Sequence, residues 1–249
     1  MIAKSWKGIL FTGSLFVFLL AAACSVSYAG GNADNGSKLY AQNCVACHGD
    51  KGQGRGGPMG WFSGGGGDVS NLIGNQLNNQ TFLSMASDDF LKATILNGRP
   101  GRPMIAWKGR LKDSEVEDVI AFLRTWQKVP SVSLDPNPVW GDPAAGQELF
   151  AGICAPCHGK KGEGTEFGPA LNNQSFLGAA SDDFILQTLR NGRQGTVMRS
   201  FLQGNNDALS ELEPYQLNNI VAYIRTWDKN AASKLEPWLM EHKPAKGKK

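Results

Sequence analysis

Apolar residues recur with helical spacing in two well-separated stretches of the chain. In each stretch they occupy positions i, i+3, i+4 and i+7, with mostly polar residues between them. This spacing places the apolar side chains on one face of a helix, so each stretch predicts an amphipathic helix. The positions are Val116, Val119, Ile120 and Leu123 in the first stretch, and Leu217, Ile220, Val221 and Ile224 in the second.

A second pair of helices is predicted to begin after Ser87 and after Ser181. Each serine suits an N-cap and is followed by two aspartates, whose charges favour the positive end of a helix. Both patterns end at an Asn-Gly pair, at Gly98 and Gly192, which is typical of a helix C-terminus. A further helix is predicted to run into each cysteine cluster. No stretch has convincing strand alternation, so the predicted fold class is all-α.

The chain contains an internal repeat. "LNNQTFLSMASDDFLKATILNGRPGRPM" matches "LNNQSFLGAASDDFILQTLRNGRQGTVM" without a gap. "VIAFLRTW" likewise matches "IVAYIRTW", and "GSKLYAQNCVACHG" matches "GQELFAGICAPCHG". Repeats of this length predict that one structural unit occurs twice.

The repeat divides the chain into segments. The two copies span residues 32–128 and 141–230, and the first carries an insertion from Gly60 to Gln76. Residues 129–140 are rich in proline and predict an extended linker, and residues 231–249 form a basic tail. Each copy has few large apolar side chains, so its core is thin and a further group is expected to fill it.

The first 29 residues are typical of an export signal. Lys4 and Lys7 precede the apolar run Ile9–Leu20, which is too short for a convincing membrane span, and Ser27-Tyr28-Ala29 suits signal cleavage. An uncleaved anchor is the alternative. The formal net charge of +3 does not indicate nucleic-acid binding. Export predicts a bacterial periplasmic location, with or without a membrane tether.

Cys24 is the only cysteine outside the repeats. It ends "LLAAAC", which looks like a bacterial lipoprotein cleavage site, although the usual leucine three residues earlier is Ala21. Two interpretations remain open. Cys24 either carries a lipid anchor or is discarded with the signal.

Each copy contains a C-x-x-C-H motif, in "NCVACHGDKGQG" and "ICAPCHGKKGEG". This motif is the attachment pattern of c-type haem, so the sequence predicts two covalent haems. The two thiols form thioether bonds to the haem vinyl groups, and the adjacent imidazole lies under the iron as an axial ligand. The predicted residues are Cys44, Cys47 and His48 in the first copy, and Cys154, Cys157 and His158 in the second.

The cysteines also match two other kinds of site. Four cysteines in two pairs match the ligand count of one tetrahedral zinc site, but zinc does not need a histidine after both pairs. A disulfide within each pair is the other alternative in an exported chain. Both explain less of the repeated motif than haem does.

The sixth iron ligand is predicted to be methionine. The third and last histidine, His242, lies in the tail, so bis-histidine ligation of both haems within one chain is excluded. The repeat then selects among the methionines. Met59 and Met85 align with alanines, whereas Met104 aligns with Met198 at the same distance after an "NGR" turn. Met104 and Met198 are therefore the predicted ligands.

With these motifs, both copies resemble class I c-type cytochromes in a tandem dihaem form. The resemblance implies that each copy is a few short helices wrapped around its haem. It also implies that a glycine and an aromatic residue on the first helix pack against aromatics on the last. The matching residues are Gly36, Tyr40, Phe122 and Trp126 in the first copy, and Gly146, Phe150, Tyr223 and Trp227 in the second.

In the same family a Gly-Pro after the haem motif orients the ligand histidine through a backbone carbonyl. Gly57-Pro58 and Gly168-Pro169 match this pattern. The insertion departs from the compact family pattern. Its Trp61 and Phe62 predict either a loop that docks a partner or a plain surface insertion.

These sites predict a relay for single electrons in a respiratory chain. An iron with histidine and methionine ligands has no open position, so it carries electrons rather than binding substrate. The main prediction is a free or lipid-tethered carrier between redox protein partners. The alternative is a fixed subunit of a membrane oxidase, a bc-type complex or a dehydrogenase. The stretch "IVAYIRTW" resembles the c-type subunits of haem–copper oxidases as much as it resembles soluble carriers. A dihaem peroxidase is less favoured because each copy has its methionine.

Overall fold

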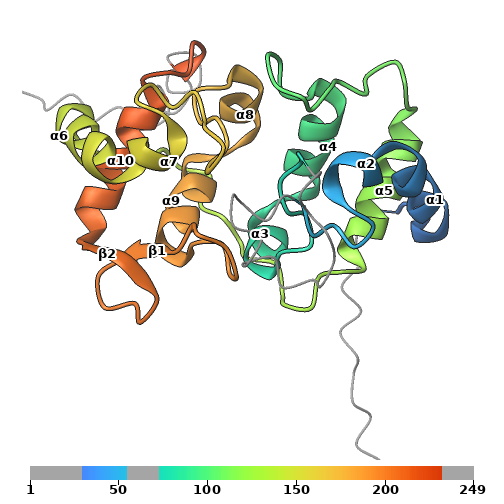
Figure 1. The fold of residues 1–249 in the computed structure, drawn as a ribbon, viewed down its shortest axis with the longest axis horizontal. Coiled ribbons are helices and arrows are strands. Elements are labelled where there is room, and N and C mark those ends of the chain that lie inside the picture. Colours follow the sequence, from blue (N-terminus) through green and yellow to red (C-terminus); the bar gives the residue numbers. More distant parts are fainter. Residues whose placement is uncertain (1–29, 55–72, 232–249) are drawn as a thin grey trace, which may run out of the picture.

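The structure is a computed structural model in which residues 30–54 and 73–231 are described. It contains two helical halves that lie side by side (Figure 1). The predicted export signal with Cys24, most of the insertion with Met59, and the tail with His242 lie outside the described residues.

The first half contains five described helices. They are α1 (Ala33–Asn43), α2 (Val45–His48), α3 (Gln80–Met85), α4 (Asp88–Asn97) and α5 (Asp113–Arg124). The side chain of Asn32 caps α1 by accepting from the backbone N–H groups of Asp34 and Asn35. Helices α1 and α5, far apart in sequence, pack against each other. Together they form the outer side of this half (Figure 1).

The second half repeats this order with a few additions. It contains α6 (Pro143–Leu149), a π-helical turn η1 (Phe150–Cys154), α7 (Ala155–His158), α8 (Gln174–Ala179), α9 (Asp182–Asn191), β1 (Ser200–Leu202), β2 (Ala208–Leu212) and α10 (Pro214–Arg225). Helix α6 packs on α10 as α1 packs on α5. Pro214 lies in the first turn of α10, where a helix tolerates the missing N–H of proline.

The predicted starts and ends of α4 and α9 are confirmed. The hydroxyl oxygen of Ser87 accepts from the N–H of Phe90 at 3.1 Å, and that of Ser181 accepts from the N–H of Phe184 at 3.0 Å. Both helices end at a glycine with positive φ, 59° at Gly98 and 65° at Gly192. A side chain there would be strained, which explains why both copies have glycine.

The predicted apolar faces of α5 and α10 are confirmed as core. All eight side chains are at most 3% exposed.

The predicted aromatic packing is confirmed as well. The Tyr40 ring lies 5.3 Å from Trp126, and the Phe150 ring lies 5.2 Å from Trp227, in both cases edge to face. Gly36 and Gly146 allow this close approach, because a Cβ on either would overlap the backbone of the facing helix.

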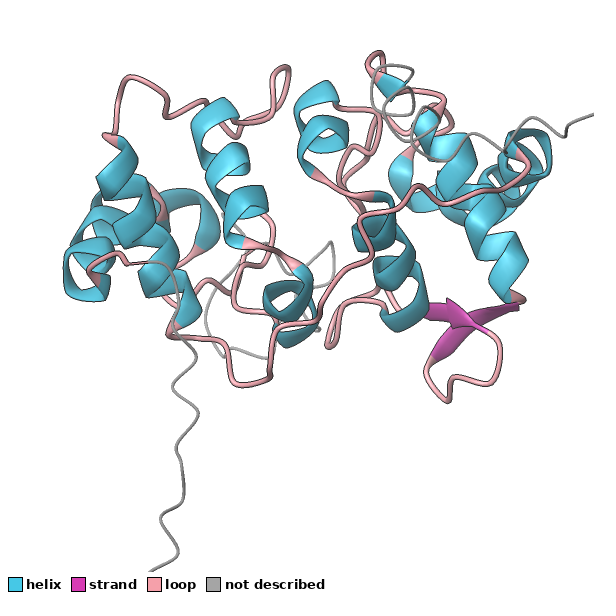
Figure 2. Ribbon diagram, turned by 180° about the vertical axis from the view of Figure 1, so that it is seen from behind, coloured by secondary structure: helices cyan, strands magenta, loops and turns pink. Residues whose placement is uncertain are grey.

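The predicted all-α class is confirmed, and the second half adds one small sheet that the sequence did not predict. Strands β1 and β2 form a two-stranded parallel sheet between the Met198 turn and α10 (Figure 2). Each strand is too short for alternation to stand out in the sequence. The equivalent segment of the first half is shorter and has only an isolated bridge, between Lys108 and Leu111.

The two halves pack through α3 and α4 of the first and α8 and α9 of the second. The rings of Phe90 and Phe184 stack across this contact with centroids 4.6 Å apart. The linker is held along it. The N–H of Val132 donates to the carbonyl of Ser84 at 2.7 Å, and the N–H of Val139 donates to the carboxylate of Asp182 at 2.8 Å. The described parts of the two halves therefore share one apolar cluster.

Candidate haem sites

In each half a four-residue helix carries the predicted haem ligands. Helix α2 begins after Cys44 and ends at His48, and α7 begins after Cys154 and ends at His158. One helical turn therefore holds two thiols and an imidazole close together. The four described cysteines are free thiols, with no disulfide among them. The disulfide alternative therefore finds no support in the described structure.

Both imidazoles are anchored through Nδ1. His48 Nδ1 lies 2.8 Å from the carbonyl oxygen of Asn75, and His158 Nδ1 lies 2.8 Å from that of Pro169. Because a carbonyl only accepts, the proton must sit on Nδ1, and Nε2 keeps its lone pair. No hydrogen bond of a described residue engages either Nε2. Each ring is thus fixed in the tautomer that an iron ligand needs.

A glycine lies directly against each imidazole. A Cβ on Gly74 would come within 2.5 Å of His48 Nδ1, and one on Gly168 would come within 3.0 Å of His158 Nδ1. The N–H of Gly74 also donates to the carbonyl of Cys47 at 2.8 Å, which ties this glycine to the haem motif. The backbone therefore approaches the ring as closely as it can, and only glycine fits.

The predicted role of Gly57-Pro58 was wrong. The residue whose carbonyl accepts from His48 is Asn75, so Gly74-Asn75 is the counterpart of Gly168-Pro169. Nineteen residues separate Gly54 from Gly74, whereas three separate Gly164 from Gly168. The insertion therefore ends before Gly74 rather than at Gln76. Gln76, not Met59, stands opposite Ala170, and Met59 falls within the insertion.

Burial sets the protonation of the predicted ligands. It lowers the pKa of His48 and of His158, against the smaller effect of the Nδ1 hydrogen bonds, so both imidazoles are neutral at physiological pH. Burial, with the neighbouring thiol, raises the pKa of Cys44 to about 11 and of Cys154 to about 12. These two thiols are therefore protonated at neutral pH.

The zinc alternative finds no site in the described structure. Zinc binds thiolates, and the buried thiols of Cys44 and Cys154 resist deprotonation. The two cysteine pairs also belong to different halves. Among residues 30–54 and 73–231, no group of three or more His, Cys, Asp or Glu side chains is placed to hold a metal ion. Neutral imidazoles with free Nε2 atoms beside paired thiols fit haem c instead.

The predicted methionine ligands lie on equivalent turns. The N–H of Arg99 donates to the carbonyl of Met104 at 2.8 Å, and the N–H of Arg193 donates to that of Met198 at 2.5 Å. Each turn follows the glycine that ends α4 or α9 and packs closely on it. Met85, which the repeat excluded, is 3% exposed in the apolar cluster between the halves, as core filler is expected to be.

Two arginines that hold the helices around each site were not predicted from the sequence. Arg124 pairs with Asp88 and donates to the carbonyls of Leu83 and Ala86, although it is only 4% exposed. Arg225 pairs with Asp182 in the same way. Each ties the last helix to the start of α4 or α9. The available signal was the "RTW" that ends "VIAFLRTW" and "IVAYIRTW", where both copies keep an arginine beside an apolar stripe.

Family models match both halves. Residues 31–123 match the model described as "Cytochrome C oxidase, cbb3-type, subunit III", and residues 143–228 match the model described as "Cytochrome c". A chain of the Kuenenia stuttgartiensis reducing HAO-like protein complex aligns with a TM-score of 0.49 and 18% identity, over 82% of this chain and 100% of that one.

Curated relatives are subunits of cbb3-type oxidases. The subunit FixP of Bradyrhizobium sp. (strain ORS 278) is 30% identical over 173 residues, which cover 65% of this chain and 52% of FixP. The subunit CcoP of Rubrivivax gelatinosus is 28% identical over 193 residues, which cover 76% of this chain and 52% of CcoP. The chain thus spans about half the length of the curated relatives it matches.

None of the helices in the described ranges is both long and apolar enough to cross a membrane. The matches to the family models extend over both C-x-x-C-H motifs and over the helices that position them. The chain is therefore a tandem c-type cytochrome, whose two cytochrome c domains each carry a covalently attached c-type haem.

Proposed function

We propose that the chain is an electron-transfer subunit of a membrane-bound respiratory oxidase or a closely related complex. The observation that carries this proposal is the match of residues 31–123 to the model of an oxidase subunit, together with relatives named as subunits of cbb3-type oxidases. These findings favour the fixed-subunit alternative over the free carrier that was the main prediction. The periplasmic side of the membrane is the proposed location, on the evidence of the export signal.

We further propose that His48 with Met104, and His158 with Met198, are the axial ligands. The supporting evidence is the free Nε2 of each histidine and the equivalent turns that hold the two methionines. A haem iron supplies one-electron chemistry, and a thioether ligand favours its ferrous state. The chain's own part is to fix each imidazole through Nδ1 and to bury it, which disfavours the extra charge of the ferric state.

A dihaem peroxidase is the least favoured of the three hypotheses from the sequence, and no observation supports it. Such an enzyme needs one haem with an open position and an acid–base group beside it. The only described histidines are His48 and His158, and the Nδ1 of each is hydrogen-bonded to a backbone carbonyl. We therefore assign no catalytic residue to this chain.

The proposed assembly is tested on native cell envelope. The envelope is washed with high salt, solubilised gently and run on a native gel that is stained for haem. We expect the dihaem chain to run in a large assembly together with oxidase subunits. The salt wash removes proteins that only adhere to the membrane surface by charge. The carrier hypothesis would be favoured instead if the haem band ran at the size of the single chain or if it were removed by the wash.

A further inference from the structure

Four arginines of the described residues form two pairs that are equivalent in the repeat. Arg124 and Arg225 each have an aspartate partner. Arg99 and Arg193 occupy equivalent positions in the two "NGR" turns, and neither forms an ion pair with a described carboxylate. Both side chains are half-buried, where an uncompensated charge is costly, and no described carboxylate pairs with either.

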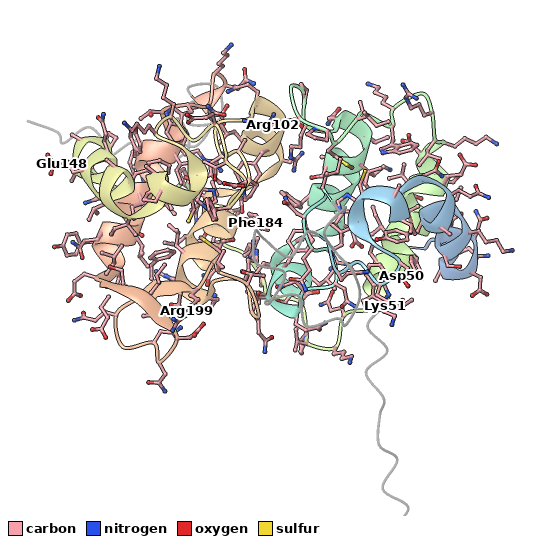
Figure 3. The ribbon with its side chains drawn as sticks, in the orientation of Figure 1. Asp50, Lys51, Arg102, Glu148, Phe184 and Arg199 are labelled. Atoms are coloured by element: carbon pink, nitrogen blue, oxygen red, sulfur yellow. The ribbon has the colours of Figure 1, made fainter. Side chains whose placement is uncertain are left out.

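Both unpaired guanidinium groups lie where the two domains meet. Arg99 Cζ is 6.0 Å from the ring centroid of Phe90 in its own domain and 5.8 Å from that of Phe176 in the other. Arg193 Cζ is 5.4 Å from Phe184 in its own domain and 5.7 Å from Phe82 in the other. Phe184, labelled in Figure 3, points into the space between the halves. The same arrangement thus occurs twice, with the domains exchanged.

Each arginine turn is also held by the opposite domain. The side-chain amide of Asn79 donates to the carbonyl of Gln194 at 2.8 Å, and that of Asn173 donates to the carbonyl of Pro100 at 3.0 Å. These carbonyls belong to the residues directly after the two arginines. Docking of the domains therefore fixes both turns, and with them the positions of both guanidinium groups.

The guanidinium groups keep hydrogen-bond donors that the described residues do not use. Arg99 donates to Thr94 Oγ1, Ser175 Oγ and the Gly98 carbonyl. Arg193 donates to Thr188 Oγ1 at 2.7 Å and, at 3.5 Å, to the carbonyl of Gly192. A guanidinium has five N–H donors, arranged as a fork that matches a carboxylate. The backbone N–H of each arginine is meanwhile bonded to the carbonyl of the proposed ligand methionine, so each arginine belongs to the turn that carries that methionine.

The missing anion has an obvious chemical class. Each c-type haem brings two propionate carboxylates, which the thioether bonds to the vinyl groups leave free. We propose that Arg99 and Arg193 each bind a propionate carboxylate of the haem in their own domain, at the interface between the domains. Each side chain then acts as a positioning residue that clamps the two domains and offsets the charge of its haem. This inference rests on the two-haem assignment but not on the proposed oxidase assembly.

The experiment replaces each arginine in the full dihaem protein, giving Arg99→Gln, Arg193→Gln, Arg99→Lys and Arg193→Lys. Midpoint potentials of both haems are measured by spectroelectrochemistry, beside haem content and thermal unfolding. A nearby positive charge disfavours the ferric state. We therefore expect each glutamine variant to affect only the haem of the domain that carries the substitution. At a fixed ambient potential, the ratio of reduced to oxidised haem in that domain should fall by roughly threefold to tenfold. The lysine variants keep the charge and are expected to restore most of this ratio.

Arg102→Gln is the matched control, because Arg102 is exposed on the same turn and its charge is screened by solvent. A clamp that acted through packing alone would change thermal unfolding but would leave both potentials where they are. Glutamine variants with full haem content and unshifted potentials would overturn the proposal. So would lysine variants that behave like the glutamine ones, or a shift confined to the haem of the other domain.

If the glutamine variants do not take up haem, the lysine variants test the proposed contact between arginine and propionate. Lysine cannot form the paired hydrogen bonds of a guanidinium, so the carboxylate bands of the haem propionates should move in redox-difference infrared spectra. Unchanged bands would overturn the proposal. The loss of the proposed oxidase assembly would leave this result untouched, because every readout is made on the isolated protein.

Discussion

The two haem sites reach the same histidine geometry by different routes along the chain. In the second domain three residues lead from Gly164 to the Gly168-Pro169 pair, whereas nineteen lead from Gly54 to Gly74-Asn75 in the first. The bond from Nδ1 to the carbonyl is nevertheless 2.8 Å in both. The comparison indicates that the site requires a glycine against the ring and a carbonyl after it. It does not require a proline.

The largest effect is expected from a methyl group added at these glycines. The Cβ of Gly74→Ala would lie 2.5 Å from His48 Nδ1, and that of Gly168→Ala 2.8 Å from the carbonyl oxygen of Cys157. We expect each to destabilise its own domain by about 3 kcal/mol, with the larger loss at Gly74, where the ring itself is displaced. Denaturant unfolding followed at each haem measures this. Unfolding midpoints equal to that of the unsubstituted protein would show that the close approach is unimportant.

A smaller, pH-dependent difference is expected on the first helices, where Tyr40 stands opposite Phe150 in the repeat. The Tyr40 hydroxyl donates to the carbonyl of Gly49 at 2.8 Å, and burial raises the pKa of this tyrosine above its ordinary value. The protonated form is therefore favoured by folding. Its stabilisation is complete below about pH 10 and is lost as the pH rises further, by up to about 1.4 kcal/mol per pH unit.

The second domain has no such group at this position, because Phe150 does not titrate. Thermal unfolding across the alkaline range should thus show a steeper loss for the first domain than for the second. Tyr40→Phe should remove the difference, at a cost of about 1 kcal/mol at neutral pH for the lost hydrogen bond. Parallel curves for the two domains in the unsubstituted protein would contradict this explanation.

The next variant shortens the connection in the first domain to that of the second. Residues 55–73 are replaced with Thr-Glu-Phe, which are residues 165–167 of the second domain. Because Gly74 and Asn75 are kept, the carbonyl still meets His48. We expect full haem loading in the first domain and a gain in stability of about 1.6 kcal/mol or less, since each halving of loop length saves only about 0.6 kcal/mol. Mass spectrometry of the intact protein counts the haems. A chain with one haem would mean that the insertion itself is needed for the first site.

The smallest effect is expected from Asn75→Pro, which gives the first site the dipeptide of the second. The substitution keeps the carbonyl, and the backbone N–H of Asn75 makes no hydrogen bond in the described structure. We expect a change in unfolding free energy below about 0.5 kcal/mol and an unchanged midpoint potential for the first haem. A clear shift in that potential would give the proline a role beyond its carbonyl.

Features written in short stretches of sequence were predictable. The N-cap serines and C-terminal glycines of α4 and α9, and the apolar faces of α5 and α10, follow from local geometry. The resemblance to class I cytochromes added the aromatic pairs, and the repeat supported them because both copies have aromatic residues at equivalent positions. The fold class and the two haems followed from these signals.

Features made by contacts between distant residues were not predictable. Asn75 was missed because only a proline marks the carbonyl in the sequence, and the insertion allowed a false alignment with Gly57-Pro58. The sheet of β1 and β2 is too short to produce a pattern. The roles of Arg99 and Arg193 depend on the other domain, which local spacing does not encode. The methionine ligands stay a prediction.

The ligation of the two irons is the central claim, and the iron–sulfur charge-transfer band of the ferric protein tests it most directly. The band is measured per haem in the unsubstituted protein, in Met104→Ala, in Met198→Ala and in the double variant, with Met85→Ala as the control. We predict that each single variant loses about half of the band, that the double variant loses all of it, and that the control keeps it, because each methionine would ligate one iron. A full band in either single variant that retains both haems would contradict the assignment.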